Sequence, residues 1–478
     1  MNNNAERFRR ELLIRVIRGY LDGTLKKDID RIPIELRPKT MEAASRCCVY
    51  KDRAVTKYRL MAMLGCGVEE EVDEAKSLAE YLDDAEKRTE LSPNILSVLD
   101  IACQACIESQ YIVTNACRGC FARPCTFTCP KGAITIVGRQ AKIDKSKCID
   151  CGKCTKVCPY GAIIRVPIPC EESCPVGAIK KDETGKEKID FDKCISCGKC
   201  LKACPFSAVL ERSQIIDILK ALKGGKEVVA MVAPSIIGQF PNRLEQIAEA
   251  LSLAGFSEME EVAFGAEKTT RNETAEFFEK MAAGDPLMTT SCCPAYVEAV
   301  KRHVPQLLKY VSHTKGPMGY SAEMVKKRSP EAVTVFIGPC VAKRKEAQSD
   351  VNTDYVMTYE ELGALFAALE INLSELHGIT LLREADGYAR GFATSCGVTS
   401  AILQDKAMAE SAEKPNAKFI NGLDKKSMKM LPLYASGKLP GNFLEVMACE
   451  GGCVGGPCSL RDVNLAALAV KKQVEETK

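Results

Sequence analysis

The sequence predicts a chain of three parts: an α-helical N-terminal segment, a middle region of small α+β modules and a C-terminal α/β domain. Residues 1–100 have apolar side chains three and four positions apart, which is typical of amphipathic helices. Residues 101–212 carry a repeating cysteine pattern. Residues 228–478 alternate strand-like apolar runs with helical runs, which indicates an α/β sheet. Residues 213–227 are expected to form a linker helix because the stretch has a helical pattern and ends near two glycines.

Composition favours metal or redox chemistry. The 478 residues have a net charge of only +3, so neither nucleic acid nor a membrane surface is expected as a partner. There is no run of ~18 apolar residues and no apolar signal-peptide core at the start, so we expect a cytoplasmic protein. In such a chain, 26 cysteines indicate metal or redox sites rather than disulfides. The three histidines lie away from the cysteine clusters, which disfavours Cys/His zinc sites.

The N-terminal segment contains two clear helical patterns, Ala5–Tyr20 and Val72–Thr89. Its three cysteines, Cys47, Cys48 and Cys66, lack the spacing of metal ligands and are expected to be buried structural residues. A docking or packing role is therefore the default expectation for this segment.

There are sixteen cysteines from residue 103 to residue 204, and fourteen of them form a repeat in which Cys-Pro ends each unit. The four units contain Cys117, Cys120, Cys125 and Cys129; Cys148, Cys151, Cys154 and Cys158; Cys170 and Cys174; and Cys194, Cys197, Cys200 and Cys204. This is the run of bacterial ferredoxins, in which three cysteines bind one [4Fe–4S] cubane and the fourth binds the neighbouring cubane. The spacing between units pairs the first with the second and the third with the fourth, which predicts tandem ferredoxin-like modules.

Three accessory cubanes follow from this pairing. Their ligand sets are Cys117, Cys120, Cys125 and Cys158; Cys148, Cys151, Cys154 and Cys129; and Cys194, Cys197, Cys200 and Cys174. The third unit departs from the consensus, because Ile164 and Pro167 stand where its first two cysteines are expected. Cys170 and Cys204 are left over from these three sets, so a fourth cubane is possible. Its four ligands would be Cys103, Cys106, Cys170 and Cys204.

The C-terminal domain carries three further cysteine motifs. Thr290–Pro294 (TSCCP) and Gly338–Lys343 (GPCVAK) each follow a strand-like run, which puts a cysteine at a strand end, where α/β domains build their sites. In the third motif, Cys449 and Cys453 are four residues apart, so both face the same way on a helical turn. The glycines around them leave room for a bulky group. Taken alone, that pair is equally compatible with zinc, a disulfide or two core cysteines.

Together, TSCCP, PCxxK and ExMxCxxGC closely resemble the signature of the large catalytic domain of iron-only ([FeFe]) hydrogenases, over about residues 226–460. The resemblance implies an H-cluster, which is a [4Fe–4S] cubane joined to a two-iron unit with carbonyl, cyanide and dithiolate ligands. The implied ligands are Cys293, Cys340, Cys449 and Cys453, the last bridging to the two-iron unit. The implied activity is reversible, 2H⁺ + 2e⁻ ⇌ H₂. The implied partners are ferredoxin or a similar small carrier and the H-cluster maturation proteins.

The same resemblance implies roles for five residues near the two-iron unit. Cys292 would relay protons to the bridgehead amine of the dithiolate, with an inert buried cysteine as the alternative. Lys343 and Ser235 would donate to the cyanide ligands, and Pro234 would shape that wall. Met447 would pack against the two-iron unit, although an ordinary core methionine fits nearly as well.

Some residues depart from the well-known family members and place the chain nearer to the group B branch. Tyr296 stands where a tryptophan is usual. The family's proton path uses a pair of glutamates, and Ser312 lines up with its serine. Glu273, Glu276 and Glu279 share one helical face but miss the family positions by about one residue, so the plainer expectation is three surface carboxylates.

Two other functions are compatible with the same resemblance. A hydrogen sensor would bind the same cofactor, but sensors usually carry an appended signalling domain and the sequence contains none. A hydrogenase-like iron–sulfur carrier or assembly protein would lack the two-iron unit. Retention of Cys292, Lys343 and Cys453 argues against this second alternative, because only the two-iron chemistry uses all three.

Overall fold

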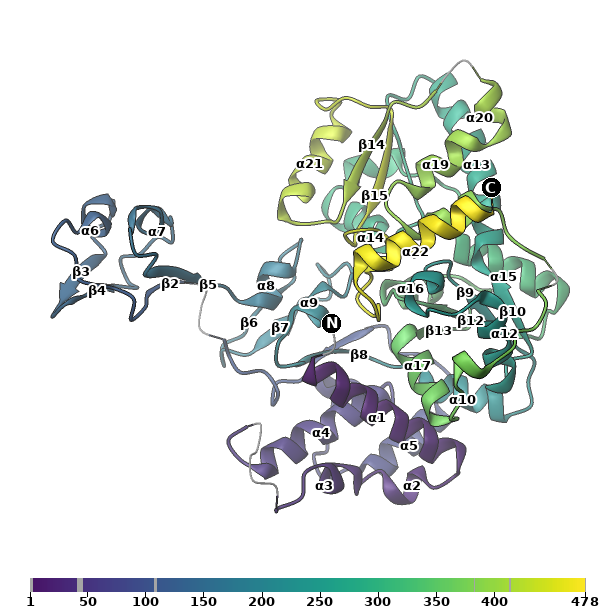
Figure 1. Ribbon diagram of the computed structural model, residues 1–478, viewed down its shortest axis with the longest axis horizontal. Helices are drawn as coiled ribbons and strands as arrows, with labels where there is room; N and C mark the ends of the chain where they lie inside the picture. Colours follow the sequence, from purple (N-terminus) through teal and green to yellow (C-terminus); the bar gives the residue numbers. More distant parts are fainter. Residues whose placement is uncertain (1–2, 41–45, 107–109, 382, 412–413, 478) are drawn as a thin grey trace.

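The computed structural model describes residues 3–40, 46–106, 110–381, 383–411 and 414–477. Figure 1 shows a large α/β body, a helical segment against one side of it, and a small lobe that projects away from both. The described parts therefore have the expected fold class, with helices first, small α+β modules next and an α/β domain last. No helix among the described residues is long and apolar enough to span a bilayer.

The N-terminal segment is helical, as expected. Its helices are α1 (Asn4–Leu21), α2 (Leu25–Asp28), α3 (Ile32–Leu36), α4 (Val49–Met63) and α5 (Leu78–Lys87), with a 3₁₀ turn η1 (Val68–Glu70). Helix α1 packs against α10 (Ile215–Lys223) and α17 (Tyr359–Ala368), and its Leu12 and Val16 share one apolar core with both helices. Because burying such side chains stabilises by roughly 2 kcal/mol each, this segment is a structural part of the α/β body.

One expectation about this region is wrong. The thiols of Cys47 and Cys48 are exposed rather than buried, while Cys66 is half-buried. Cys48 precedes the first turn of α4, so the pair lies at a helix end that the neighbouring elements do not cover. The stretch expected to form a linker helix contains α10, which ends at Lys223 before Gly224. Ile215 and Ile218 are completely buried between the N-terminal helices and the large sheet.

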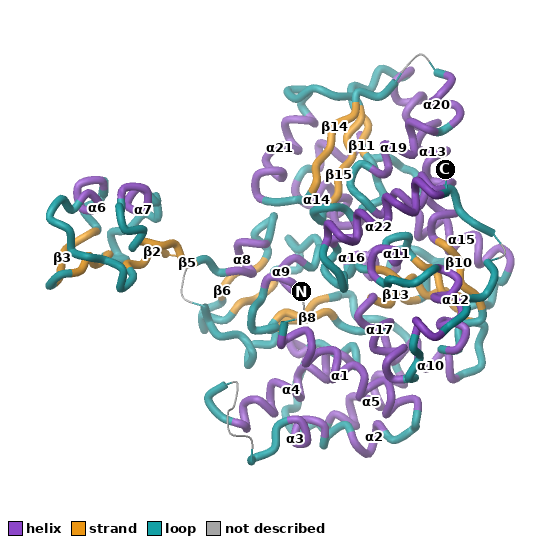
Figure 2. Tube along the Cα trace, viewed as in Figure 1, coloured by secondary structure: helices purple, strands orange, loops and turns teal. Residues whose placement is uncertain are grey.

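The middle region consists of two small lobes with short elements and much loop (Figure 2). Its strands are β1 (Leu96–Val98), β2 (Gln110–Val113), β3 (Ile134–Val137), β4 (Gln140–Ile143), β5 (Ile163–Val166), β6 (Ile179–Lys181), β7 (Glu187–Ile189) and β8 (Val209–Glu211). Its helices are α6 (Pro124–Thr128), α7 (Lys153–Val157), α8 (Pro169–Ser173) and α9 (Lys199–Ala203). The strands pair antiparallel as β1–β8, β2–β5, β3–β4 and β6–β7. We call residues 110–166 the distal lobe and residues 167–211 the proximal lobe.

The C-terminal body contains two parallel sheets, with strand orders β10-β9-β12-β13 and β11-β15-β14. Their strands are β9 (Val228–Val232), β10 (Glu258–Glu261), β11 (Met288–Thr289), β12 (Val333–Gly338), β13 (Tyr355–Thr358), β14 (Ala417–Asn421) and β15 (Phe443–Met447). The remaining helices are α11 (Ile236–Gln239), α12 (Leu244–Leu253), α13 (Val262–Ala282), α14 (Pro294–His303), α15 (Pro317–Arg328), α16 (Ala342–Ala347), α18 (Gly387–Arg390), α19 (Gly397–Gln404), α20 (Lys406–Glu410), α21 (Lys425–Ala435) and α22 (Val463–Glu476). The 3₁₀ turns are η2 (Pro305–Tyr310), η3 (Leu373–Glu375), η4 (Gly391–Ala393) and η5 (Cys453–Gly455).

The four-stranded sheet is covered on both faces, as is usual for parallel strands. Alternate residues of a strand point to opposite faces. Val228 and Ala230 of β9 belong to the core shared with α1, α10 and α17, whereas Val229 and Met231 pack with α15 residues such as Met318. Strands β9, β12 and β15 are buried along their whole length, which explains their mainly apolar sequences; Thr334 in β12 and Glu445 in β15 are buried polar exceptions.

Candidate functional site

Four cysteines converge where strands of both sheets end. Cys293 follows β11, Cys340 follows β12, and Cys449 and Cys453 follow β15. Burial raises the pKa of the Cys449 thiol well above its usual range, and negative charge on Cys340, Cys293 and Cys453 raises it further. Burial likewise raises the pKa of Cys340 to about 12 and that of Cys453 to about 11. The sequence-predicted ligands from three separate motifs therefore form one group.

This donor set fits an iron–sulfur cluster better than a single metal ion. All four thiols are free of disulfides. Within the described part of the chain, no three His, Cys, Asp or Glu side chains lie close enough together to hold one ion. Thiols with raised pKa values are neutral and badly solvated on their own, whereas thiolates bound to iron are deprotonated. A multi-iron cluster satisfies four widely placed sulfurs together, so the zinc and disulfide alternatives are disfavoured here.

The residues expected beside the two-iron unit line one small cavity of about 60 Å³ next to this group. The cavity walls include Pro234, Ser235, Cys292, Lys343, Met447 and Cys453. The other walls are mainly apolar, with Val262, Met318 and Phe336 among them. Such a wall excludes water and lowers the local dielectric, which strengthens every charge interaction inside.

Lys343 is a buried cation in this wall, and the protein itself provides an anion for it. Its Nζ lies 2.6 Å from Oε2 of Glu346, one turn further along α16. Burial alone lowers the pKa of Lys343, but Glu346 and the thiolates of Cys340 and Cys453 raise it above its usual value. The ammonium group therefore stays charged in the cavity wall. Sequence reasoning missed Glu346, although its i,i+3 spacing from Lys343 was a usable signal.

Ser235 has a buried partner that the sequence did not reveal. Its hydroxyl lies 2.7 Å from the hydroxyl of Tyr359, and the single phenol proton can be donated either to Ser235 or to the backbone oxygen of Ala233, which is 3.2 Å away. Burial raises the pKa of Tyr359 far above its usual range, so the phenol remains a neutral donor. Because Ala233 and Ser235 flank Pro234, Tyr359 fixes the loop that follows β9.

Two glutamates of α13 are inside the protein, so the expectation of three surface carboxylates is wrong for them. Glu273 is completely buried, and its Oε1 accepts from the backbone N–H of Ser291 at 3.3 Å. Glu276 is partly buried and accepts from the hydroxyl of Ser312 at 2.7 Å. Only Glu279 is exposed, as expected. The burial of Glu273 and Glu276 could not be foreseen because a helix face does not itself tell which element covers it.

The two glutamates have opposite pKa shifts. Burial raises the pKa of Glu273 to about 8, and the charges of Glu276 and Glu445 add to this effect. Burial also disfavours ionisation of Glu276, but hydrogen bonds from Ser312, His313 and Thr314 outweigh it and lower its pKa. Glu273 thus holds a proton at neutral pH while Glu276 is ionised, which is the arrangement expected of a proton-transfer pair.

Cys292, which lines the cavity, lies near the buried glutamate Glu273. Burial raises the pKa of its thiol well above the usual value, and Glu273 is the largest charged contributor. Ser312 lies between the two carboxyl groups, and Glu276 lies 3.7 Å from the Nζ of Lys280. Cys292, Glu273, Ser312 and Glu276 therefore lie near one another in this order, and a hydrogen bond joins Ser312 to Glu276.

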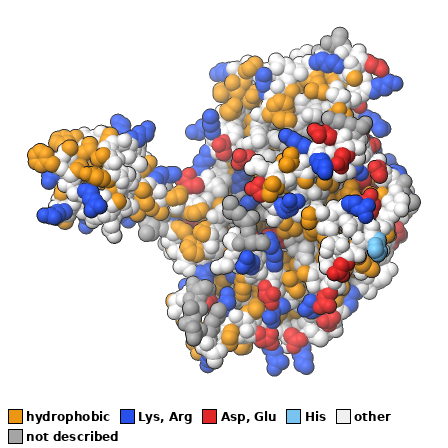
Figure 3. Space-filling model, in the orientation of Figure 1, with side chains coloured by type: hydrophobic (Ala, Val, Ile, Leu, Met, Phe, Trp, Pro, Cys, Tyr) orange, Lys and Arg blue, Asp and Glu red, His pale blue; other side chains and the backbone are white. Residues whose placement is uncertain are grey.

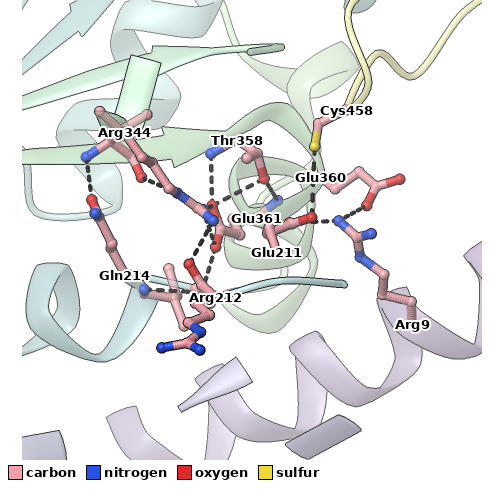
Figure 4. Close-up of polar contacts among 12 residues, drawn as sticks. Arg9, Glu211, Arg212, Gln214, Arg344, Thr358, Glu360, Glu361 and Cys458 are labelled. Atoms are coloured by element: carbon pink, nitrogen blue, oxygen red, sulfur yellow. Dashed lines mark hydrogen bonds and ion pairs between the residues drawn. The ribbon is translucent and has the colours of Figure 1, made fainter. Parts of the chain in front are cut away.

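A buried ion pair anchors the helix that carries Lys343 (Figure 4). Arg344 is completely buried, and its Nη2 donates to both oxygens of Glu361 at 2.9 and 2.8 Å. Its Nη1 also donates to the backbone oxygen of Arg212, at the end of the proximal lobe, at 2.7 Å. Arg344 is therefore a positioning residue that ties α16 to α17 and to the middle region.

The N-terminal segment also contacts α17 and the end of β8. Nη2 of Arg9 in α1 lies 2.6 Å from carboxylate oxygens of both Glu211 and Glu360 (Figure 4). The other oxygen of Glu211 accepts from Cys458 at 3.9 Å. Cys458 follows the Cys453 turn, so one arginine links the N-terminal helix to the loop of the four-cysteine group.

The three predicted accessory sets are also supported by proximity. Negative charge on Cys120 and Cys158 raises the pKa of Cys125, and charge on Cys129 raises that of Cys148. Charge on Cys194 and Cys174 likewise raises the pKa of Cys197. Each pattern agrees with the assigned ligand set. Backbone N–H groups also donate to ligand sulfurs, for example from Ala133 to Cys129 at 3.3 Å and from Ala178 to Cys174 at 3.2 Å. Such hydrogen bonds stabilise an anionic cluster.

The four cysteines of the possible fourth cubane, Cys103, Cys106, Cys170 and Cys204, lie near one another as well. Burial raises the pKa of Cys106, with Cys103 and Cys204 adding to it, and burial and Glu187 raise that of Cys170 to about 12, with Cys204 also contributing. These contacts support a fourth cubane.

The proximal lobe touches the four-cysteine group. A Cβ on Gly198 would lie 2.6 Å from Val341 and 2.8 Å from Pro457, so only glycine permits this close approach. Negative charge on Cys197 also raises the pKa of Cys449. A cubane in the proximal lobe would therefore be the immediate electron partner of the buried centre.

Fold and site define an iron–sulfur protein with a buried four-cysteine centre at the carboxyl ends of two parallel sheets. A family model described as "Iron only hydrogenase large subunit, C-terminal domain" matches residues 226–457, and 4Fe-4S binding models match residues 140–163 and 169–208. The chain is 30% identical to the periplasmic [Fe] hydrogenase large subunit of Nitratidesulfovibrio vulgaris over 373 residues, which cover 66% of this chain and 85% of the relative.

Two other relatives are a hydrogenase and an iron–sulfur cluster assembly factor. Iron hydrogenase 1 of Clostridium pasteurianum is 28% identical over 408 residues, covering 72% of this chain and 70% of the relative. The cytosolic Fe-S cluster assembly factor NAR1 of Encephalitozoon cuniculi is 26% identical over 190 residues, covering 36% of this chain and 51% of the relative. The chain belongs to the iron-only hydrogenase family.

Proposed function

We propose that the chain is a cytoplasmic [FeFe]-hydrogenase that interconverts protons, electrons and H₂. Electrons would pass through the accessory cubanes to or from ferredoxin or a similar small carrier. The observation that carries the proposal is that Cys292, Lys343 and Cys453 line one cavity beside the four-cysteine group. When bound, the H-cluster supplies the iron pair at which H₂ forms or is split. Cys293, Cys340, Cys449 and Cys453 would hold it.

The protein's own groups have separate roles around that cluster. Lys343, kept charged by Glu346, would bind one anionic cyanide ligand, and the hydroxyl of Ser235, oriented by Tyr359, would bind the other. Pro234 and Met447 would exclude water from the cavity. These contacts favour negative charge at the cluster and fix its orientation without reorganisation during turnover.

Protons would move along side chains that are already in place. Cys292 would exchange a proton with the cavity on one side and with Glu273 on the other. Glu273 would exchange with Glu276 through the hydroxyl of Ser312. A carboxyl group with a pKa of about 8 can both give and accept a proton near neutral pH, which suits a reversible relay.

A turnover assay with a matched variant tests the proposal. Protein matured with the H-cluster assembly machinery should evolve H₂ from reduced methyl viologen and take up H₂ with the oxidised dye. The variant Cys292→Ala should lose at least about 100-fold of this turnover while keeping its full iron content. Cys47→Ala is the control, because Cys47 is exposed in the N-terminal segment and does not line the cavity. No turnover by fully loaded parent protein, or equal turnover by Cys292→Ala and the parent, would contradict the proposal.

A carrier or assembly protein without the two-iron unit is the second candidate. The partial likeness to the NAR1 assembly factor favours it. Iron analysis separates the two, because this candidate predicts iron from cubanes alone even after exposure to the maturation machinery.

A further inference from the structure

The distal lobe carries most of the chain's positive charge. Its residues 110–166 include ten Lys and Arg but only two Asp and no Glu, a net charge of +8. The whole chain has 66 basic and 63 acidic side chains, so the remainder has 56 against 61 and is net acidic. The excess is therefore local, and the overall net charge of +3 conceals it.

These cations are all exposed, and most of them form no ion pair among the described residues. They are Arg118, Arg123, Lys131, Arg139, Lys142, Lys145, Lys147, Lys153, Lys156 and Arg165. Among the described residues, the ion pairs of this set are Lys147 with Asp144 at 3.8 Å and Arg165 with Glu172. Bound cubanes would offset part of the charge, but they lie inside the lobe while the cations are at its surface. The surface potential of the lobe thus stays positive.

Two aromatic side chains project from the same lobe. Phe121 is 101% exposed and Phe127 is 86% exposed, although large apolar side chains are normally shielded from water. Figure 3 shows hydrophobic and basic side chains together on the face of the lobe that it draws. Ile149 and Tyr160 add exposed apolar surface. An apolar patch rimmed by charges of one sign marks a protein-docking surface.

The position of the aromatic residues connects this surface to electron transfer. Phe121 directly follows Cys120, and Phe127 lies between Cys125 and Cys129, all three being predicted cubane ligands. A protein that covers these rings would bring its own redox centre close to the cubanes. The lobe is also the part of the chain that projects farthest from the four-cysteine centre (Figure 1). It is therefore suited to be the outer end of a relay.

We propose that the distal lobe is the docking surface for an acidic one-electron carrier protein, with Phe121 and Phe127 as apolar anchors. This inference rests on the proposed electron relay. One electron passes from the reduced carrier, which is oxidised, to a cubane of the lobe, which is reduced. Two such transfers supply the two electrons of one H₂. Two lobes do not fit face to face, because two surfaces of charge +8 repel each other.

Binding measurements test the surface independently of hydrogenase activity. We would titrate the cluster-loaded protein with an oxidised, acidic two-cubane ferredoxin by calorimetry. The pair Phe121→Ala/Phe127→Ala should raise Kd about tenfold or more, since both rings are fully available to a partner. The pair Arg118→Gln/Lys131→Gln should raise Kd by about three- to tenfold and weaken its salt dependence.

Controls come from exposed residues on the catalytic body. Leu468→Ala on α22 and Lys426→Gln/Lys429→Gln on α21 remove similar apolar surface and similar charge, and should leave Kd unchanged. Reduced ferredoxin should also bleach the cubane absorbance more slowly in both lobe variants than in the parent. Turnover with methyl viologen should be the same in all of them, because a small dye needs no docking surface.

Several results would overturn the proposal. Equal Kd values for the parent and both lobe variants would do so, as would equal losses in the control variants. Tighter binding of a poly(U) RNA than of the ferredoxin, or self-association through the lobe in sedimentation experiments, would assign the surface to another partner. If the chain lacks hydrogenase activity, the binding and bleaching results still decide this question, so the two failures are distinguishable.

Discussion

Replacement of Glu273 by Gln tests the proton series most sharply. The amide has the same shape as the carboxyl group and can still accept from the N–H of Ser291, so the fold should be retained. It cannot, however, release and regain a proton. With a pKa of about 8, Glu273 is protonated in roughly nine of ten molecules at pH 7 and is ready to transfer. Glu273→Gln should therefore lower turnover by about 10²- to 10⁴-fold, the usual contribution of a positioned acid–base group.

The same substitution has a calculable effect on stability. The pKa of Glu273 is raised from 4.5 to about 8, so its favourable contribution is complete below pH 4.5 and is lost as the pH rises to 8. Across that window the carboxyl group costs about 1.4 kcal/mol of stability per pH unit, or about 5 kcal/mol in all. Glu273→Gln removes this slope, so its melting temperature should exceed the parent's increasingly from pH 5.5 to 8.

The assays are methyl viologen-linked H₂ evolution and thermal melting across that pH range, both on protein with equal iron content. Glu279→Gln is the matched control, because Glu279 is exposed on the same helix. If Glu273→Gln kept more than a third of parental turnover, the series from Cys292 through Glu273 would not be the proton route. If the melting difference did not change with pH, Glu273 would not be a buried, protonated carboxyl group.

Two further predictions concern the supports of the site. Arg344→Met leaves the carboxylate of Glu361 buried without its cation, which should cost about 3–5 kcal/mol, lower the melting temperature and loosen iron bound at the four-cysteine group; the exposed Lys327→Met serves as its control, and equal melting of both variants would contradict the anchoring role. Cys170→Ala should remove one cubane, about four iron atoms per chain, while the remaining clusters keep their electron paramagnetic resonance signals; unchanged iron content would mean that no fourth cubane forms.

Much of the site followed from sequence because cysteine ligands come in short, fixed spacings. The grouping of the accessory cysteines needed only the order and spacing of their motifs. The four-cysteine group was implied by the resemblance to the iron-only hydrogenases, and it agrees with the rule that parallel strands end at one edge of a sheet. Strands β9, β12 and β15 were likewise predictable, because burial on both faces favours mainly apolar runs.

What could not be predicted depends on contacts between distant segments. Tyr359 supports Ser235 from 124 positions away, and Arg9 meets Glu211 across 202 positions. Neither pair has a local signature. The burial of Glu273 depends on which side of α13 faces the rest of the domain, and spacing within one helix leaves that undetermined. Local patterns therefore predicted ligands well, whereas the groups that orient or protonate them required the fold.

Infrared spectroscopy of the matured protein tests the central claim most directly. The cavity beside Cys453 is expected to hold a two-iron unit with diatomic ligands, and Lys343 is expected to contact one of them. The spectrum should show bands of iron-bound carbonyl and cyanide, and the cyanide bands should shift in a Lys343→Met variant that still binds the unit. A spectrum without such bands, from protein whose cubanes are fully loaded, would contradict the account.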